Sequence, residues 1–315
     1  MSDFHHISVL LHETIDAMEI NPDGIYVDCT LGGGGHSEEI LKRLSPNGFL
    51  YGIDRDDEAI AAASARLSKY PNFKAIHANF HTLRSVAEEE GILGKADGVL
   101  FDLGVSSHQL DDVSRGFSYH GDAPLDMRMD RREEVSAKTL VNTLPESELA
   151  RILRDYGEEK AASRIASFIV REREEKTIET TGELVDIISR AMPAKMKRDK
   201  HPAKRSFQAI RIAVNGELTG LPNALEAAYE TLKPGGRLAV ITFHSLEDRL
   251  TKSFLRDKET GCTCPKEFPI CVCGKKPKMQ SVIRKPLEAG EAELEANPRA
   301  RSAKLRVSEK TDYTE

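Results

Sequence analysis

The segment VDCTLGGGGH, residues 27–36, decides the fold of this chain. A short apolar run ends in an acid, and four consecutive glycines follow it before a helix-like stretch. Glycines between a strand and a helix let the backbone turn tightly and approach a ligand closely. A phosphate-binding P-loop would end in Lys followed by Ser or Thr, where this chain has His36-Ser37. The alternative is a plain tight turn whose acid caps a helix.

Outward from this segment, strand-like and helix-like stretches alternate. Strands are predicted at 24–28, 49–54, 73–77 and 98–102, with helices at 37–44, 56–67 and 83–90 between them. Such alternation is typical of βαβ units, which build a parallel sheet with helices on both faces. The sequence therefore predicts an α/β fold.

The alternation stops after Asp102 and returns about a hundred residues later. Between them the pattern predicts loops and then helices, at 146–155, 160–176 and 181–191, with no convincing strand. The pattern then predicts a helix at 225–232, a turn at 233–236 and a strand at 237–243. An alternating run at 302–307 would close the sheet. We expect one domain made of residues 1–110 and 211–315, interrupted by a helical insertion, 111–210.

Composition narrows the function classes. The chain has 315 residues, 39% hydrophobic and 30% charged, which is an ordinary globular mixture. No stretch approaches the roughly 18 apolar residues of a membrane helix, and the N-terminus lacks the pattern of a secretory signal. We expect a cytoplasmic protein with no membrane partner. The net charge of -6 excludes a globally basic nucleic-acid binder, so any contact with nucleic acid must come from a local patch.

An acid downstream of the glycines suggests a nucleoside ligand. Asp54 ends the second predicted strand, where a carboxylate can accept both hydroxyls of a ribose. The third glycine of the dinucleotide fingerprint is missing, since its place falls on Ser37 or Glu38. A ribose-binding acid without a diphosphate fingerprint favours a nucleoside that lacks a pyrophosphate. S-adenosylmethionine is the common cofactor of that kind, and NAD becomes the weaker alternative.

These features resemble the class I methyltransferases, and longer strings resemble one family of them. The glycine segment, Asp54, Asn79-Phe80, Asp102 and the turn at 233–236 follow the class I pattern. The strings are His12-Glu13, DLGVSSHQLD (102–111), RGFS (115–118), PLDMRMD (124–130), HPAKRSFQAIRIAVN (201–215), FHSLEDR (243–249) and NPRARS (297–302). Over residues 5 to 307 the chain is similar to the MraW family of ribosomal RNA methyltransferases.

The resemblance implies a function and a set of contacts. It implies a class I, Rossmann-like fold and methylation of N4 of a cytidine in the decoding region of 16S small-subunit ribosomal RNA. S-adenosylmethionine is the implied cofactor and the small ribosomal subunit the implied partner; a homodimer stays open. The implied cofactor contacts are Gly34, Gly35, His36, Asp54, Phe80, Asp102 and Gln109. Two other functions remain as alternatives: a nicotinamide oxidoreductase, and an RNA-binding module that keeps the fold without the activity.

Asp102 is the candidate catalytic residue. The amine of cytosine is a poor nucleophile, so a site must offer acceptors to its N–H groups and take up the lost proton. Asp102 ends the fourth predicted strand, where amino-methyltransferases keep an acid or amide, but Leu-Gly-Val follows it in place of Pro-Pro-aromatic. His244 and Asp248 are the second candidates, with helix capping as their alternative role. Phe80 is expected to stack on adenine or to be a core aromatic.

A basic run predicts contact with RNA. Its seven cations are Lys195, Lys197, Arg198, Lys200, Lys204, Arg205 and Arg211, against the single acid Asp199. We predict RNA contacts at Lys204, Arg205 and Arg211 and RNA recognition by the insertion, with a solvated charged face as the alternative. Arg115, Arg128, Arg131 and Arg132 are expected to extend the patch. Phe117 and Tyr119 would stack on bases or pack the loop.

Four of the five cysteines lie close together, as Cys262-x-Cys264-x6-Cys271-x-Cys273. This pattern allows a tetrathiolate zinc site, although its spacing is tighter than usual for structural zinc. Free or redox-active thiols are the alternative, and the sequence assigns no metal.

Overall fold

The computed structural model describes residues 8–193, 201–265 and 270–313, and the chain divides into two compact units. The first unit comprises residues 1–104 and 218–315, and the second comprises residues 105–217. The divisions fall a few residues from the expected boundaries at 110/111 and 210/211. No helix within the described ranges has the length and apolar character needed to cross a bilayer.

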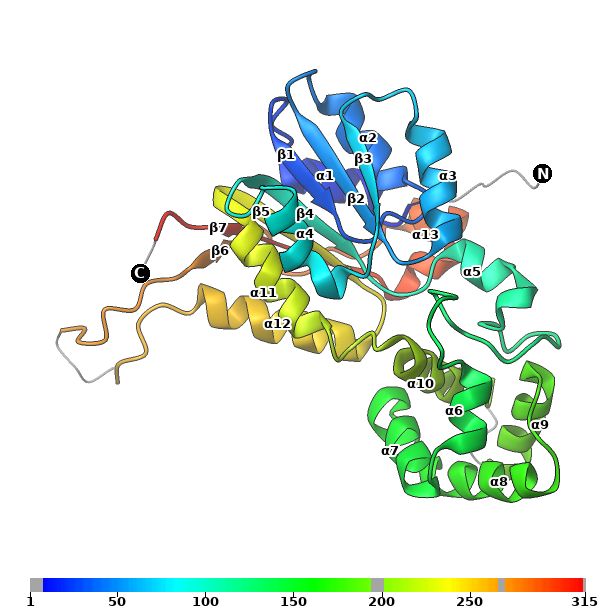
Figure 1. The fold of residues 1–315 in the computed structure, drawn as a ribbon. Coiled ribbons are helices and arrows are strands. Elements are labelled where there is room, and N and C mark those ends of the chain that lie inside the picture. Colours follow the sequence, from blue (N-terminus) through cyan, green and yellow to red (C-terminus); the bar gives the residue numbers. More distant parts are fainter. Residues whose placement is uncertain (1–7, 194–200, 266–269, 314–315) are drawn as a thin grey trace. The chain divides into compact units, whose positions relative to one another are not determined.

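The first unit is built on a seven-stranded sheet (Figure 1). Its strands are β1 (Ile25–Asp28), β2 (Phe49–Asp54), β3 (Phe73–His77), β4 (Ala96–Asp102), β5 (Leu232–Thr242), β6 (Met279–Ser281) and β7 (Lys304–Lys310). They lie in the order β3-β2-β1-β4-β5-β7-β6. Neighbours from β3 to β5 pair in parallel, whereas β7 is antiparallel to both β5 and β6. The predicted parallel α/β sheet is confirmed.

Helices cover both faces of this sheet, so its central strands are buried on both sides. Along β4, Val99 and Phe101 join one hydrophobic cluster and Leu100 joins the other. The first cluster takes side chains from α4 (Leu83–Glu89), α11 (Leu221–Thr231) and α12 (Ser245–Glu259). The second takes them from α1 (Leu11–Met18), α2 (Gly35–Arg43) and α3 (Asp57–Leu67). A short helix, α13 (Glu291–Ala296), precedes β7.

Two details of the sheet differ from the sequence prediction. Residues 233–236 are not a separate turn but a bulge within β5: Leu232 pairs with Ala96 and Arg237 with Gly98, so the register shifts between them. Gly235 makes this possible with a left-handed φ of +78°. The sequence prediction also missed β6, which lies outside β7 at the end of the sheet. A strand of three residues is too short to show an alternating pattern.

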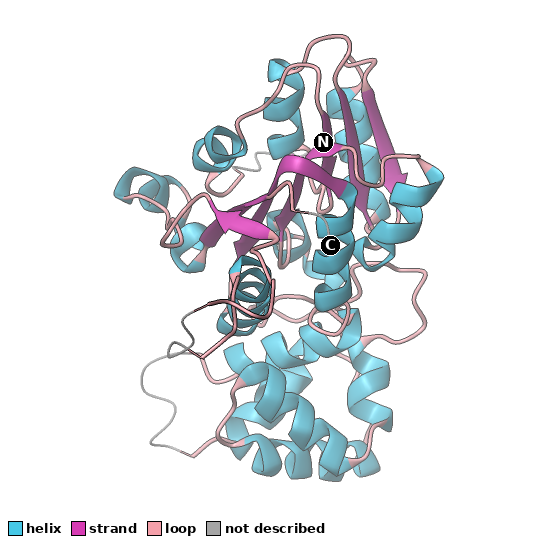
Figure 2. Ribbon diagram, turned by 90° about the vertical axis from the view of Figure 1, so that its left-hand side faces the viewer, coloured by secondary structure: helices cyan, strands magenta, loops and turns pink. Residues whose placement is uncertain are grey.

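The second unit is helical (Figure 2). Its helices are α5 (Ser107–Asp111), α6 (Ala137–Thr143), α7 (Glu146–Gly157), α8 (Ala162–Glu175), α9 (Thr181–Ala191) and α10 (Lys204–Asn215). They enclose a hydrophobic core of their own, to which Ile165 and Leu184 contribute fully buried side chains. Thr180 and Glu183 form a capping box at the start of α9. The helices predicted at 146–155, 160–176 and 181–191 are confirmed; α5, α6 and α10 were not individually predicted.

Candidate active site at the carboxyl edge of the sheet

The glycine segment connects β1 to α2, and its geometry requires glycine at several positions. Gly32 and Gly34 have left-handed φ angles of +49° and +75°, which side chains rarely tolerate. A Cβ atom on Gly35 would lie 1.9 Å from Ser8 Oγ. The backbone is tied to the sheet, since Leu31 N donates to Ile53 O at 2.9 Å. The predicted tight glycine loop is therefore present after the first strand.

Asp54, at the end of β2, holds this loop in place. Its Oδ2 accepts a hydrogen bond from Gly32 N at 2.8 Å, and its Oδ1 accepts one from Asp56 N at 2.9 Å. Burial raises the pKa of Asp54 despite these hydrogen bonds. Each carboxylate oxygen has two acceptor positions, so the group can still accept hydrogens from a ligand.

Asp28, at the end of β1, stabilises the same loop through hydrogen bonds to its carboxyl group. The side chain is only 1% exposed; it accepts hydrogen bonds from Ser37 Oγ at 2.7 Å and from Thr30 N at 3.1 Å. Burial raises its pKa to about 6. The sequence singled out this acid only as the end of a strand, and nothing in its local pattern indicated so complete a burial.

Asp102, at the end of β4, reaches the edge of the sheet where β1 and β2 also end. Its backbone N–H donates to Thr30 Oγ1 at 2.6 Å, and 17% of its side chain is exposed. Its Oδ1 atom is buried and has no hydrogen-bond partner among the described residues. Burial, reinforced by the negative charges of Asp28 and Glu247, raises the pKa of Asp102 well above its usual value.

His36, in the first turn of α2, faces Asp102. Its Nε2 lies 3.1 Å from Val9 O, and its Nδ1 lies 3.7 Å from Asp102 Oδ2. A carbonyl oxygen can only accept, so Nε2 carries a hydrogen and Nδ1 is the atom turned toward the carboxyl group. Two predicted site residues that are distant in sequence are thus brought together as a histidine–carboxyl pair.

Two other predicted cofactor contacts have structural roles of their own. Phe80 is 9% exposed and lies edge-on to Phe101, with ring centroids 5.7 Å apart, so it packs as a core aromatic. Gln109 belongs to the second unit, where it forms a capping box with Ser106 at the start of α5. Its Oε1 accepts a hydrogen bond from Ser106 N at 3.0 Å.

The second candidates for catalysis stabilise a helix and the sheet. His244 Nδ1 accepts a weak hydrogen bond from Glu247 N, 3.4 Å away, at the start of α12, which confirms the capping role. Asp248 accepts a hydrogen bond from Arg306 Nε at 2.8 Å. Sequence analysis missed Glu247, which is 2% exposed and accepts a hydrogen bond from Phe243 N at 2.8 Å. Its only local signal is its place three residues after the cap.

The basic run is only partly described. Lys195, Lys197, Arg198 and Lys200 lie outside the described residues. Lys204 and Arg205 are exposed at the start of α10, and Arg205 Nη1 donates to Glu158 O at 3.1 Å. Arg211 forms a two-point ion pair with Glu217, at 2.9 and 2.8 Å, and is 15% exposed. Lys204 and Arg205 are therefore the better placed of the three predicted contacts to meet RNA.

The expected extension of this patch is wrong for Arg115. That side chain is 2% exposed, and its Nη2 donates to the carbonyl oxygens of Arg128 and Met129, at 3.1 and 3.0 Å. Its charge is used to hold a buried loop together, which a sequence pattern does not reveal. Phe117 is also a core residue, at 5% exposure, whereas Tyr119 stacks on His201 with centroids 4.5 Å apart.

Arg128 and Arg132 are each engaged with the aspartate two residues earlier. Arg128 Nη2 lies 2.7 Å from Asp126 Oδ2, and Arg132 Nη2 lies 2.7 Å from Asp130 Oδ2. Each aspartate partly offsets the charge of its arginine, while the Arg132 side chain stays 62% exposed.

Four features together define a class I methyltransferase. They are the order of the strands, the antiparallel β7, the glycine segment after β1 and the acids that end β2 and β4. Within that class, residues 3–311 match the model of the MraW methylase family, and the chain belongs to that family. The nicotinamide oxidoreductase alternative is thereby excluded. The methyl donor is S-adenosylmethionine.

Relatives match the chain over nearly its whole length. The chain is 58% identical over 308 residues to a protein of Clostridium botulinum strain Kyoto called ribosomal RNA small subunit methyltransferase H, covering 98% of this chain and 99% of that protein. It is 56% identical over 306 residues to a protein of the same name from Symbiobacterium thermophilum, covering 96% of each. Among solved structures, a putative rRNA methylase from Clostridium thermocellum is 12% identical, with a TM-score of 0.45, over 98% of this chain and 99% of that one.

The residues at the carboxyl edge fit the cofactor. The glycine segment leaves no side chains at its left-handed positions, so a ligand can approach the backbone. Asp54 retains acceptor capacity for ribose hydroxyls. The unpartnered oxygen of Asp102 can accept a hydrogen from a group brought to the same edge.

Proposed function

We propose that this protein methylates N4 of a cytidine in the decoding region of 16S small-subunit ribosomal RNA. Its relatives are named ribosomal RNA small subunit methyltransferase H, which supports the small-subunit RNA as substrate. One observation supports an amine as the group that receives the methyl. The buried Oδ1 atom of Asp102 has no hydrogen-bond partner within the described part of the chain, so it can accept a hydrogen bond from an amine N–H group.

The cofactor contacts belong to this proposal. When bound, S-adenosylmethionine supplies an electrophilic methyl group on a sulfonium. Gly34 and Gly35 allow close approach of the ligand, while Asp54 accepts hydrogens from its ribose. Phe80 and Gln109 are assigned by family resemblance alone, and both side chains already have partners in their own units.

Asp102 acts on the amine of the cytosine. Its Oδ1 accepts a hydrogen bond from the amine and orients the nitrogen lone pair toward the methyl group. The raised pKa makes its carboxylate a stronger base than an ordinary aspartate, so the group can take up the proton that the methylated nitrogen loses. His36, held by Val9 O, is a positioning residue that keeps Asp102 in place through the 3.7 Å contact.

The helical second unit takes the RNA in this proposal. Lys204 and Arg205 are exposed side by side at the first turn of α10, where they can meet consecutive phosphates. Their exposure supports RNA binding by the region that interrupts the sheet in sequence. Arg211 is kept from this role by its ion pair with Glu217.

The test is single-turnover methylation with cofactor and RNA both saturating. We expect Asp102→Asn to lower the rate on the order of a hundredfold, as for the loss of a preorganised electrostatic group, and Asp102→Ala to be worse. The wild-type rate should rise as pH increases through the raised pKa of Asp102, and the Asn variant should lose that dependence. Asp57→Asn, in the exposed first turn of α3, is the matched control.

The product identifies the acceptor atom. Nuclease digestion and mass spectrometry of the RNA should find N4-methylcytidine at one position. A methyl group on another atom would refute the proposed acceptor. A wild-type rate for Asp102→Asn would instead leave the residue as a cofactor or structural contact only.

A further inference from the structure

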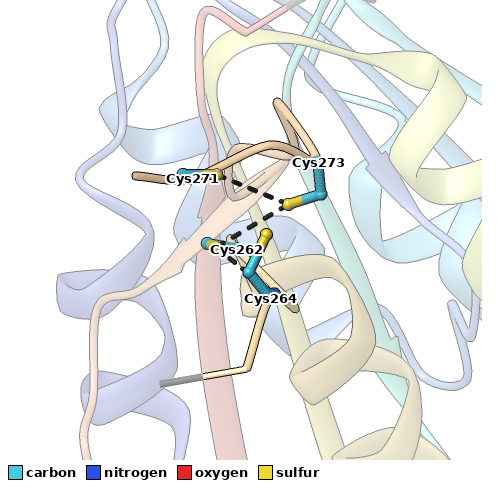
Figure 3. A group of neighbouring side chains, drawn as sticks. All are labelled: Cys262, Cys264, Cys271 and Cys273. Carbon is cyan, nitrogen blue, oxygen red and sulfur yellow. Dashed lines mark hydrogen bonds between the residues drawn. The ribbon is translucent and has the colours of Figure 1, made fainter. Parts of the chain in front are cut away.

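Four cysteines gather in the segment that connects α12 to β6 (Figure 3). The sulfur atoms of Cys262, Cys264, Cys271 and Cys273 all lie within 4.8 Å of one another. Cys271 Sγ is 3.5 Å from Cys273 Sγ, which is in turn 3.7 Å from Cys262 Sγ. The fifth cysteine, Cys29, is buried directly after β1 and takes no part.

These distances fit a metal-centred tetrahedron and do not fit disulfides. With Zn–S bonds of about 2.3 Å, the sulfur atoms of a tetrahedral site are separated by about 3.8 Å. A disulfide needs about 2.05 Å between sulfurs. The separations of 3.5 and 3.7 Å are therefore close to the edge of a zinc tetrathiolate.

A hydrophobic core does not account for the cluster. Cys262, Cys271 and Cys273 are exposed, and the neighbouring Ile270 and Val272 are 75% and 74% exposed. Apolar side chains in this segment point into solvent while the four sulfurs turn toward one another. The convergence thus has the arrangement of a ligand set, with the apolar side chains excluded from it.

Backbone N–H groups are placed to stabilise sulfur in its charged form. Cys264 N donates to Cys262 Sγ at 3.4 Å, and Val272 N donates to Cys264 Sγ at 3.4 Å. Hydrogen bonds of this kind to the ligating atoms are typical of metal-bound thiolates.

Repulsion between the sulfur atoms in their charged form favours a bound cation. Four thiolates this close repel one another unless a cation neutralises them. Soft sulfur ligands in a tetrahedral set select Zn²⁺ over hard cations such as Mg²⁺ or Ca²⁺.

We propose that Cys262, Cys264, Cys271 and Cys273 bind one Zn²⁺ ion in a closed tetrahedral site. Each thiol that is protonated releases its proton to solvent as its sulfur bonds to the metal. Four protein ligands leave no open coordination position, so the ion is structural and takes no part in methyl transfer. It fixes the connection between α12 and β6, which the exposed apolar residues cannot hold by packing.

Metal content tests this directly. The full-length protein, reduced and offered Zn²⁺, should retain about one zinc per chain after gel filtration, measured by plasma mass spectrometry. Cys271→Ser/Cys273→Ser should lose it. Cys29→Ser and Thr263→Ala are matched controls that leave the four ligands intact and should keep the zinc. A zinc-free wild-type protein, or equal zinc in the double variant, would overturn the proposal.

The coordination geometry and the structural role need separate measurements. Co²⁺ in place of Zn²⁺ should give the intense visible bands of a tetrahedral site and thiolate-to-metal charge-transfer bands. A weak octahedral spectrum, stoichiometric iron with sulfide, or Cys–Cys disulfides in the protein purified under non-reducing conditions would each overturn it. Chelation should speed tryptic cleavage after Lys275 in the wild-type protein, and an unchanged cleavage rate would contradict the structural role.

Discussion

At the residue scale, the proposed site is made of carboxyl groups held where their charged forms are unfavourable. Asp28 and Asp102 end neighbouring strands, and burial raises the pKa of both. The second group has an oxygen without a hydrogen-bond partner in the described ranges. A purely structural position would be more stable with a neutral side chain. The presence of an acid there is consistent with use by the reaction.

Asp102→Asn should therefore stabilise the protein at alkaline pH in the absence of cofactor. Because folding raises the pKa of Asp102, the stability that it contributes is full below the unfolded value, about 3.9, and is lost as pH rises through the folded value. The Asn variant, neutral at every pH, should melt higher than wild type at pH 8, by roughly 2–4 °C per kcal/mol relieved. Calorimetry across pH 4 to 8 checks this.

The difference between the two proteins should shrink toward pH 4, where Asp102 is protonated in the folded state and about half protonated in the unfolded state. Asp57→Asn, at an exposed position, should show no comparable gain at pH 8. An Asp102→Asn variant that melts at or below the wild-type temperature at pH 8 would contradict the burial penalty.

Asp54→Ala should weaken binding of S-adenosylmethionine and of its demethylated product. The change removes an acceptor for the ribose and also leaves Gly32 N and Asp56 N without their partner. We expect a loss on the order of 1–3 kcal/mol by titration calorimetry. Asp57→Ala removes the same charge nearby and should bind normally. Binding of NAD by the wild-type protein would contradict the nucleoside site that lacks a diphosphate cradle.

At the element scale, α10 is an amphipathic helix with two roles: one face packs in the core and its start presents cations to solvent. Phe207 and Ile210 are buried in the core of the second unit, while Lys204 and Arg205 face solvent. The far end is structural: Asn215 Oδ1 accepts a hydrogen bond from Met129 N at 2.8 Å. Only the start of the helix is therefore available for a phosphate backbone.

Lys204→Ala/Arg205→Ala should weaken RNA association and flatten its salt dependence by roughly one unit of slope for each phosphate that the variant no longer neutralises. Fluorescence anisotropy with a small-subunit RNA fragment over a salt series measures both. Arg154→Ala/Lys176→Ala removes the same charge from exposed positions elsewhere in the second unit and should leave the slope unchanged. An unaltered slope in the α10 variant would make those two residues a solvated face.

At the scale of the whole molecule, the two units have separate hydrophobic cores. The second unit interrupts the sequence between β4 and α11, and its helices bury their apolar faces on one another. Each unit thus buries its apolar surface within itself, which is the condition for a segment to fold independently.

A fragment of residues 105–217 should fold on its own. We expect a helical circular dichroism spectrum and a cooperative thermal transition, because the core needs no residue from the first unit. In the same fragment, Ile165→Ala should lower the free energy of unfolding by about 2–5 kcal/mol, since this side chain is fully buried. A fragment without a cooperative transition would show that the second unit depends on the first.

The sequence by itself determined the α/β class, the glycine segment and the position of Asp54 and Asp102 at strand ends. These follow from local patterns, because hydrophobic periodicity reports which face of an element is buried. Short or bulged elements carry too few residues for such a pattern. For that reason β6 was missed and residues 233–236 were predicted as a turn.

Only the tertiary structure decided which polar groups meet. His36 and Asp102 are distant in the chain and converge because α2 and β4 direct them to one edge. Arg211 was predicted to contact RNA but pairs with Glu217, and Arg115 is buried on backbone carbonyls. A cation's charge is visible in the sequence, but its burial and its partner depend on contacts between residues far apart. These contacts separate the charges that hold the fold from those left to bind RNA.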